Sequence, residues 1–177
     1  AGHIVALGGF PPAVFLAPPQ VRVPLGAPGG VELRAEATGS GPLHYRWLRG
    51  GQPFSGPDAP VLRLPAEPAG TAWYTVEVSN AFGRRISPGT EVRILGPLRL
   101  RDLRREAGGT FHAWLEREGT PGWEPLPGHR LVVETSTDLV NWTPALYGLG
   151  ADGRLAVVPD VAGPVAQFFR VREVPAP

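Results

Sequence analysis

The sequence predicts an all-β protein built from two antiparallel β-sandwich domains in tandem. Short runs of alternating apolar and polar residues recur along the 177 residues, as expected for half-buried strands. The 24 glycines and 22 prolines fall between these runs, which is typical of strands joined by tight turns. The one helix candidate, residues 101–107, ends at Gly108-Gly109, so a strand is favoured there.

The first half of the chain alternates regularly. Residues 31–37 place apolar side chains at odd positions and charged ones at even positions, which predicts a strand with one buried face. Similar patterns predict strands at 44–47, 61–64, 74–78 and 91–94. Gly50-Gly51 predicts a hairpin turn, because both central residues of such a turn need positive φ.

The pattern restarts after Gly96-Pro97, which is therefore the expected domain boundary. Strands are expected at 98–101, 111–115, 131–134, 155–158 and 167–172, with a hairpin turn at Asp152-Gly153. The expected organisation is an extended N-terminal segment over residues 1–17, a first sandwich over 18–96 and a second over 97–177.

An ordered series of residues identifies the first sandwich more closely. Pro18-Pro19, the run 31–35, Tyr45-Arg46-Trp47 and the run 74–83 resemble successive strands of an immunoglobulin domain of the I-set type, in a cysteine-free bacterial form. The resemblance implies that Trp47 is the buried core indole and that Tyr74 bonds upstream backbone through its hydroxyl. It also implies that Ala35 and Val76 occupy the two positions of the usual disulfide.

The second half resembles a fibronectin-like C-terminal module of secreted bacterial proteins. The resemblance rests on the block 135–144, which reads TSTDLVNWTP, together with the later block 167–172, QFFRVR. The short polar residues of the first block favour a turn. The resemblance implies that Trp142 then anchors the next strand in the core.

Composition excludes several classes of function. The net charge is +1, so no basic field attracts nucleic acid. The chain has no cysteine, which excludes disulfides, thiolate catalysis and Cys-ligated metal, and no apolar run is long enough for membrane insertion. The chain begins Ala1-Gly2-His3 rather than with Met, which indicates a processed protein or an excised fragment. This start fits signal-peptide cleavage, in line with the secreted or cell-surface location that we expect, and it equally fits the remnant of a tag.

The sequence predicts no catalytic, cofactor-binding or metal-binding residues, and so a protein that is not an enzyme. Residues 148–153 match G-x-G-x-x-G, but a strand-like run follows instead of the helix that a dinucleotide site needs. The four histidines lack metal-site spacing, and no serine lies in G-x-S-x-G. A calcium site near Asp138, Asp152 and Asp160 stays open as an alternative, without EF-hand spacing to support it.

A cluster of arginines and a set of tryptophans are further candidates for a binding surface. Arg99, Arg101, Arg104 and Arg105 lie near three glutamates, which favours a solvated, salt-bridged face over an anion site. Outward-facing tryptophans leave two interpretations open. One is an interaction surface, because indole rings stack on sugars or are buried in protein interfaces. The other is a contact between the two domains or partial packing within one of them. The tryptophans expected to be exposed are Trp73, Trp114 and Trp123.

The first functional hypothesis is a non-catalytic extracellular structural or interaction protein that self-associates, as a surface fibre subunit does. Its donor strand would be the N-terminal segment with Ile4, Val5 and Leu7, added to the edge of a neighbouring sandwich. The alternative is an accessory carbohydrate-binding or spacer module of a larger secreted enzyme or adhesin. Its polysaccharide platform would be Trp73, Trp114 and Trp123.

Overall fold

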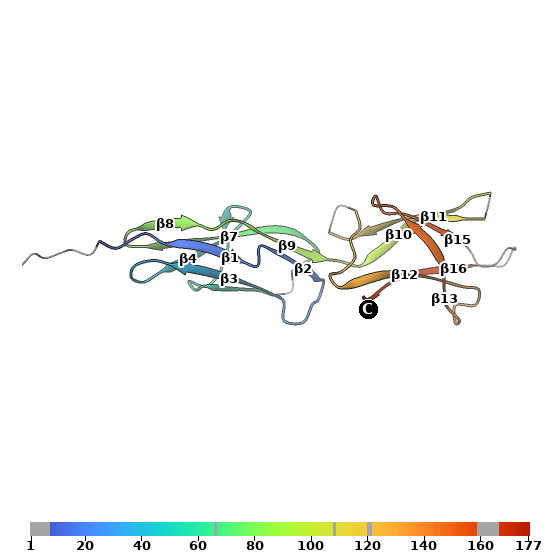
Figure 1. Cartoon of the computed structure of the whole chain (residues 1–177), viewed down its shortest axis with the longest axis horizontal. Helices are drawn as coiled ribbons and strands as arrows, with labels where there is room; N and C mark the ends of the chain where they lie inside the picture. Colours follow the sequence, from blue (N-terminus) through green and yellow to red (C-terminus); the bar gives the residue numbers. More distant parts are fainter. Residues whose placement is uncertain (1–7, 66, 108, 120–121, 159–166) are drawn as a thin grey trace, which may run out of the picture. The chain divides into compact units, whose positions relative to one another are not determined.

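A computed structural model describes residues 8–65, 67–107, 109–119, 122–158 and 167–177 (Figure 1). All regular secondary structure in this part of the chain consists of β-strands, as the alternation predicted. Contacts divide the chain into two compact units, the first made mainly of residues before Ile94 and the second of Ile94–Pro177 with the short stretches Val23–Leu25 and Pro68–Gly70. This division falls close to the expected boundary at Gly96-Pro97.

The first sandwich consists of two antiparallel sheets. One sheet has the order β1 (Ala13–Ala17), β3 (Val31–Thr38), β6 (Val61–Leu64). The other has the order β2 (Gln20–Pro24), β9 (Thr90–Leu95), β7 (Gly70–Asn80), β4 (His44–Arg49), β5 (Gln52–Pro53), and β8 (Gly83–Ile86) also pairs with β7. Strands β4 and β5 form the expected hairpin, since Gly50 and Gly51 both have positive φ and connect the paired residues Arg49 and Gln52.

The core of the first sandwich contains the residues that the resemblance placed there. Trp47 is 1% exposed, and its indole Nε1 donates a hydrogen bond to the Ala59 carbonyl at 3.2 Å. Ala35 and Val76, at the positions of the usual disulfide, are both buried. The sandwich is therefore built on apolar packing where related domains have a bridge.

Tyr74 is also buried, on the same face of β7 as Val76. Its ring meets Phe54 edge-on at 5.7 Å, and the Arg49 guanidinium lies 5.8 Å from its centroid. Burial and the nearby Glu67 carboxylate raise the pKa of Tyr74. Its hydroxyl makes no hydrogen bond within the described ranges. The hydrogen bond to upstream backbone, which the resemblance to an immunoglobulin domain implied, is therefore still only a prediction.

The expected start of the first sandwich at Pro18 is wrong. Residues 13–17 form β1, which pairs with β3 of the same sandwich from Ala13 opposite Thr38 to Ala17 opposite Arg34. Val14 and Leu16 are buried in that pairing, whereas Phe15 points outward. The alternating apolar residues suggested a free donor strand. They instead pack within the first sandwich. Ile4, Val5 and Leu7 lie outside the described residues.

The second sandwich also has two antiparallel sheets (Figure 1). One has the order β10 (Leu98–Arg105), β11 (Phe111–Arg117), β15 (Arg154–Val158), β14 (Leu146–Leu149). The other has the order β13 (Thr143–Pro144), β12 (His129–Ser136), β16 (Phe168–Pro175). Residues 101–105 are part of a strand, as favoured over a helix. The core consists of Leu115, Leu131, Val133, Ala145, Leu155 and Val157.

Candidate interaction surfaces

Two of the three tryptophans expected on the surface are exposed. Trp73 on β7 is 54% exposed and Trp114 on β11 is 44% exposed. Trp123 is instead partly buried against the core of the second sandwich, and its Nε1 donates to the Gly150 carbonyl at 3.2 Å. The inward packing of Trp123 could not be predicted from the sequence. Trp123 lies in a Gly/Pro-rich loop, and the alternation of neighbouring residues does not determine where such a loop lies on the sandwich.

The expectation that Trp142 lies in the core is wrong. Trp142 is half-buried in the turn before β13, and the Arg170 guanidinium lies 4.2 Å from its ring centroid. Arg170 also pairs with Glu134 at 2.6 Å. Because Glu134 and Arg170 are opposite each other in the β12–β16 pairing, Trp142 covers the outer surface of that sheet.

The turn that carries Trp142 is built around Asp138. The Asp138 carboxylate accepts hydrogen bonds from the Ser136 hydroxyl, the Val140 and Asn141 amides and the Asn141 side chain. Bonds from Asn141 contribute most to holding the pKa of Asp138 well below its usual value. These donors occupy the carboxylate with local contacts, which is the ordinary role of Asp in a turn.

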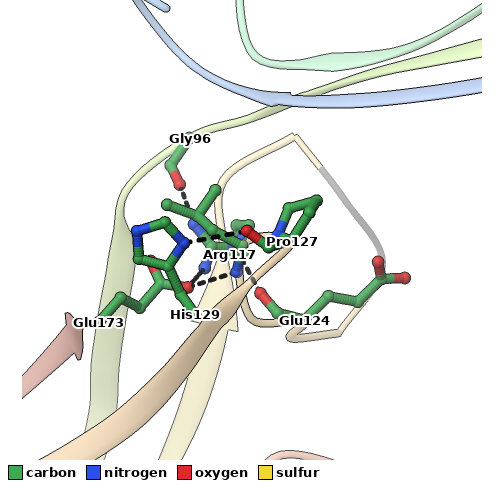
Figure 2. A network of polar contacts seen from close by, with 7 residues as sticks. Gly96, Arg117, Glu124, Pro127, His129 and Glu173 are labelled. Atoms are coloured by element: carbon green, nitrogen blue, oxygen red, sulfur yellow. Dashed lines mark hydrogen bonds and ion pairs between the residues drawn. The ribbon is translucent and has the colours of Figure 1, made fainter. Parts of the chain in front are cut away.

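Strand β11 places an arginine inside the second sandwich (Figure 2). The Arg117 side chain is 2% exposed and pairs with Glu173 of β16. It also donates to the Gly96 carbonyl at 2.6 Å and to the Glu124 carbonyl at 2.8 Å. The same Glu173 oxygen accepts from the Leu126 amide at 2.7 Å. This network ties β11, β16 and the loop between β11 and β12 together.

Sequence reasoning did not single out Arg117. A signal was present, since residues 111, 113, 115 and 117 share one face of an alternating strand, and an arginine on that inward face requires a buried partner. Its donors are directed at two carbonyls and a carboxylate of this chain, which is a structural arrangement.

The histidines and aspartates that were considered as metal-binding residues also contact neighbouring groups of the chain. His44 lies 2.9 Å from Asp58, His112 lies 3.4 Å from Glu106, and His129 Nδ1 lies 3.0 Å from the Pro127 carbonyl oxygen. Within the described ranges, no group of three or more His, Asp or Glu residues could hold a metal. Asp152 caps the β14–β15 turn by accepting from the Arg154 amide, and Asp160 lies outside the described residues.

Two of the four arginines in the cluster on β10 form salt bridges. Arg99 pairs with Glu118 at 2.8 Å and Arg101 with Glu116 at 2.6 Å. These residues line a polar depression of about 440 Å³ together with Arg117, Gly119 and Gly122. Because each of the two exposed arginines faces a carboxylate, the depression offers no concentrated positive charge for an anion.

One sheet edge of the second sandwich has no partner among the described residues. Strand β16 pairs along all eight residues with β12, and no described strand pairs with its other side. Unpaired N–H and C=O groups along such an edge are a template for another strand. Among the described residues there is no helix that could span a membrane.

Comparisons with known proteins match the fold and nothing finer. No protein-family model and no curated protein matches the chain. The crystal structure of the N-terminal four Ig domains of Dscam1 isoform 6.9 is similar at a TM-score of 0.50, with 16% identity over 95% of this chain and 48% of that one. Sidekick-1 immunoglobulin domains 1-5 give 0.49, with 15% identity over 96% of this chain and 40% of that one.

The chain thus spans less than half the length of either similar structure. Identity this low carries information about the fold alone. The I-set subtype, the bacterial form and the origin of the TSTDLVNWTP block stay predictions. What the fold and the comparison establish together is an all-β chain of immunoglobulin-like β-sandwiches in tandem.

Proposed function

We propose that this chain is a non-catalytic structural and interaction module that acts outside the cell, where copies of it associate into a surface fibre by strand addition. The edge of β16 that pairs with no described strand carries the proposal, because backbone donors and acceptors along an unpaired edge can pair with an added strand. The polar networks support a structural role, since their donors are directed at acceptors of the chain itself.

The test is self-association of the full chain over a concentration series. Analytical ultracentrifugation is expected to show mass increasing with concentration, and negative-stain electron microscopy is expected to show ordered filaments at the highest concentrations. A compact monomer at every concentration would remove self-assembly as the function.

The alternative function is polysaccharide binding, for which two of the three expected tryptophans are exposed. Trp123 is packed against its own sandwich, so one exposed tryptophan remains in each unit, Trp73 in the first and Trp114 in the second. Affinity electrophoresis in polysaccharide gels tests this alternative. Retardation that disappears in Trp114→Ala or Trp73→Ala would favour it over self-assembly, and unchanged migration in every gel would exclude it.

A further inference from the structure

We propose that the outer face of strands β12 and β16 binds an acidic polysaccharide, whose carboxylate or sulfate groups pair with Arg130, Arg170 and Arg172. The site uses neither the backbone edge of β16 nor the exposed tryptophans Trp73 and Trp114. It therefore goes beyond the proposed function and does not depend on self-association.

The three arginines lie on the same face of the sheet. Val133 of β12 is 1% exposed in the core, and strand residues alternate between faces, so Arg130 and Glu134 lie on the outer face. Arg170 of β16 is directly opposite Glu134, and residues opposite each other in an antiparallel pair share a face. Arg172 follows two residues later and lies on that face as well.

Arg170 and Arg172 share a single carboxylate. The Nε of Arg170 donates to Glu134 Oε2 at 2.6 Å, and the Nε of Arg172 lies 3.2 Å from the same oxygen. Within the described ranges, the terminal Nη atoms of these two guanidinium groups make no hydrogen bond. The two side chains are 37% and 50% exposed, so their Nη donors can reach an external acceptor.

Neighbouring groups fix the two guanidinium groups in position. The Glu134 side chain is 11% exposed, and the hydrogen bond from Arg170 lowers the pKa of Glu134, so this carboxylate stays charged at neutral pH. The Arg170 guanidinium also lies 4.2 Å from the centroid of the Trp142 ring. Donors that are fixed before binding lose less conformational entropy when they bind an anion.

The charge of this face differs from that of the β10 cluster. On β10, Arg99 and Arg101 each pair with a glutamate of their own. On the outer face of β12 and β16, Arg170 and Arg172 share one glutamate, and Arg130 makes no ion pair in the part of the chain that the structure describes. Three positive charges and one negative charge give these strand residues a formal charge of +2. An anion is the complementary ligand.

The shape of the site favours a polymer over a single small anion. The arginines are spread over two paired strands, and successive residues of one face lie about 7 Å apart along a strand, so one anionic group cannot contact all three. A polysaccharide with an anionic group on successive sugars can do so, because each guanidinium binds a carboxylate or sulfate through paired N–H donors. The valines on this face, Val132 and Val174, are half-buried and offer a protein partner little apolar contact.

Biolayer interferometry of the full chain on immobilised polysaccharides tests the site. Polygalacturonate carries carboxylates, dextran sulfate carries sulfates, and dextran is the uncharged control. We expect binding to at least one of the two acidic polysaccharides, weakening as salt is added, and no binding to dextran. Absence of binding to both acidic polysaccharides would overturn the proposal.

Arg130→Gln/Arg172→Gln is the variant that locates the site. Both side chains are exposed, so we expect its unfolding curve to match that of the unaltered chain. We expect its affinity for the acidic polysaccharide to fall at least about tenfold, because charge-assisted hydrogen bonds are lost.

Arg104→Gln/Arg154→Gln is the matched control, since it removes the same charge from the outer face of the other sheet of this sandwich. Both arginines are exposed and make no ion pair within the described ranges. We expect the control to change the affinity by less than about twofold. Equal weakening in the two variants would show attraction by net charge alone and overturn the site.

Poly-glutamate is the probe for the other class of anionic partner. Under the proposal it binds more weakly than the acidic polysaccharide, because it has no sugar backbone to lie across the sheet. Binding of poly-glutamate but of neither acidic polysaccharide would overturn the proposal and assign this face to an acidic protein.

Discussion

Arg117 shows at the scale of one residue how the second sandwich is held together. Its guanidinium is always charged, and the interior of a sandwich is a costly place for a charge unless every donor finds an acceptor. Glu173 supplies the opposite charge, and the Gly96 and Glu124 carbonyls accept the remaining bonds (Figure 2). Removal of the cation therefore leaves the Glu173 charge without its counter-charge and takes one donor from each of the two carbonyls.

Arg117→Met is expected to lower the free energy of unfolding of the second sandwich by about 3–5 kcal/mol, because it leaves the Glu173 charge without its cation. Urea denaturation followed by tryptophan fluorescence measures the loss. The matched control is Arg99→Met on the same sheet, whose exposed bridge to Glu118 should contribute less than about 1 kcal/mol. Arg117→Met/Glu173→Met should recover part of the loss. A double variant as unstable as Arg117→Met alone would contradict this account.

The β14–β15 hairpin is the element in which a motif and its structure can be compared directly. The sequence GLGADG reads as a nucleotide-binding motif when taken literally and as a hairpin when the next strand is considered. The structure has the hairpin, with the Gly150 amide donating to the Arg154 carbonyl at 2.9 Å and the Gly153 amide to the Gly150 carbonyl at 3.0 Å. Its glycines serve the turn: Gly153 has φ of +88° and is buried.

Gly153→Ala is expected to destabilise the second sandwich by at least about 1–2 kcal/mol, the cost of a left-handed backbone with a side chain. A Cβ there would also lie 2.6 Å from the Leu115 carbonyl oxygen and 2.9 Å from the Trp123 ring. Gly148→Ala in the same motif is the control, since its Cβ would meet nothing within 4 Å. Thermal unfolding compares the two. Equal melting temperatures would show that the turn does not need glycine at position 153.

At the scale of the whole molecule, two sandwiches are built without a covalent cross-link. In the first sandwich the buried Trp47, Val76 and Ala35 occupy the places where the resemblance puts an indole beside a disulfide. Packing therefore supplies the stability that a bridge of this loop length supplies elsewhere. The given sequence contains no cysteine, so neither sandwich has a disulfide that could be reduced.

Ala35→Cys/Val76→Cys is expected to form a disulfide on oxidation and to raise the free energy of unfolding of the first sandwich by about 2–4 kcal/mol. The reason is that the bridge closes a long loop and reduces the entropy of the unfolded chain. Mass spectrometry detects the disulfide, and denaturation with and without reductant measures the change in the free energy of unfolding. Each single cysteine variant serves as a control. Absence of the bridge under oxidation would show that the resemblance misplaces these two positions.

The sequence by itself determined the fold class of this protein, ten of the sixteen strands in the described residues and two hairpin turns. Alternation with a period of two decides which side chains share a face, and Gly50-Gly51 and Asp152-Gly153 decide where the chain reverses. These are local properties, so the inward positions of Trp47, Val76 and Leu115 could be predicted from neighbouring residues alone.

Only the tertiary structure decided which strands lie side by side. It assigned residues 13–17 to the first sandwich, placed Trp142 against Arg170 instead of the core, and packed Trp123 inward. It also left β16 with one partner among the described residues. Alternation cannot encode these outcomes, because pairing and edge position depend on residues far apart in the chain, and an edge strand has the same local pattern as a central one.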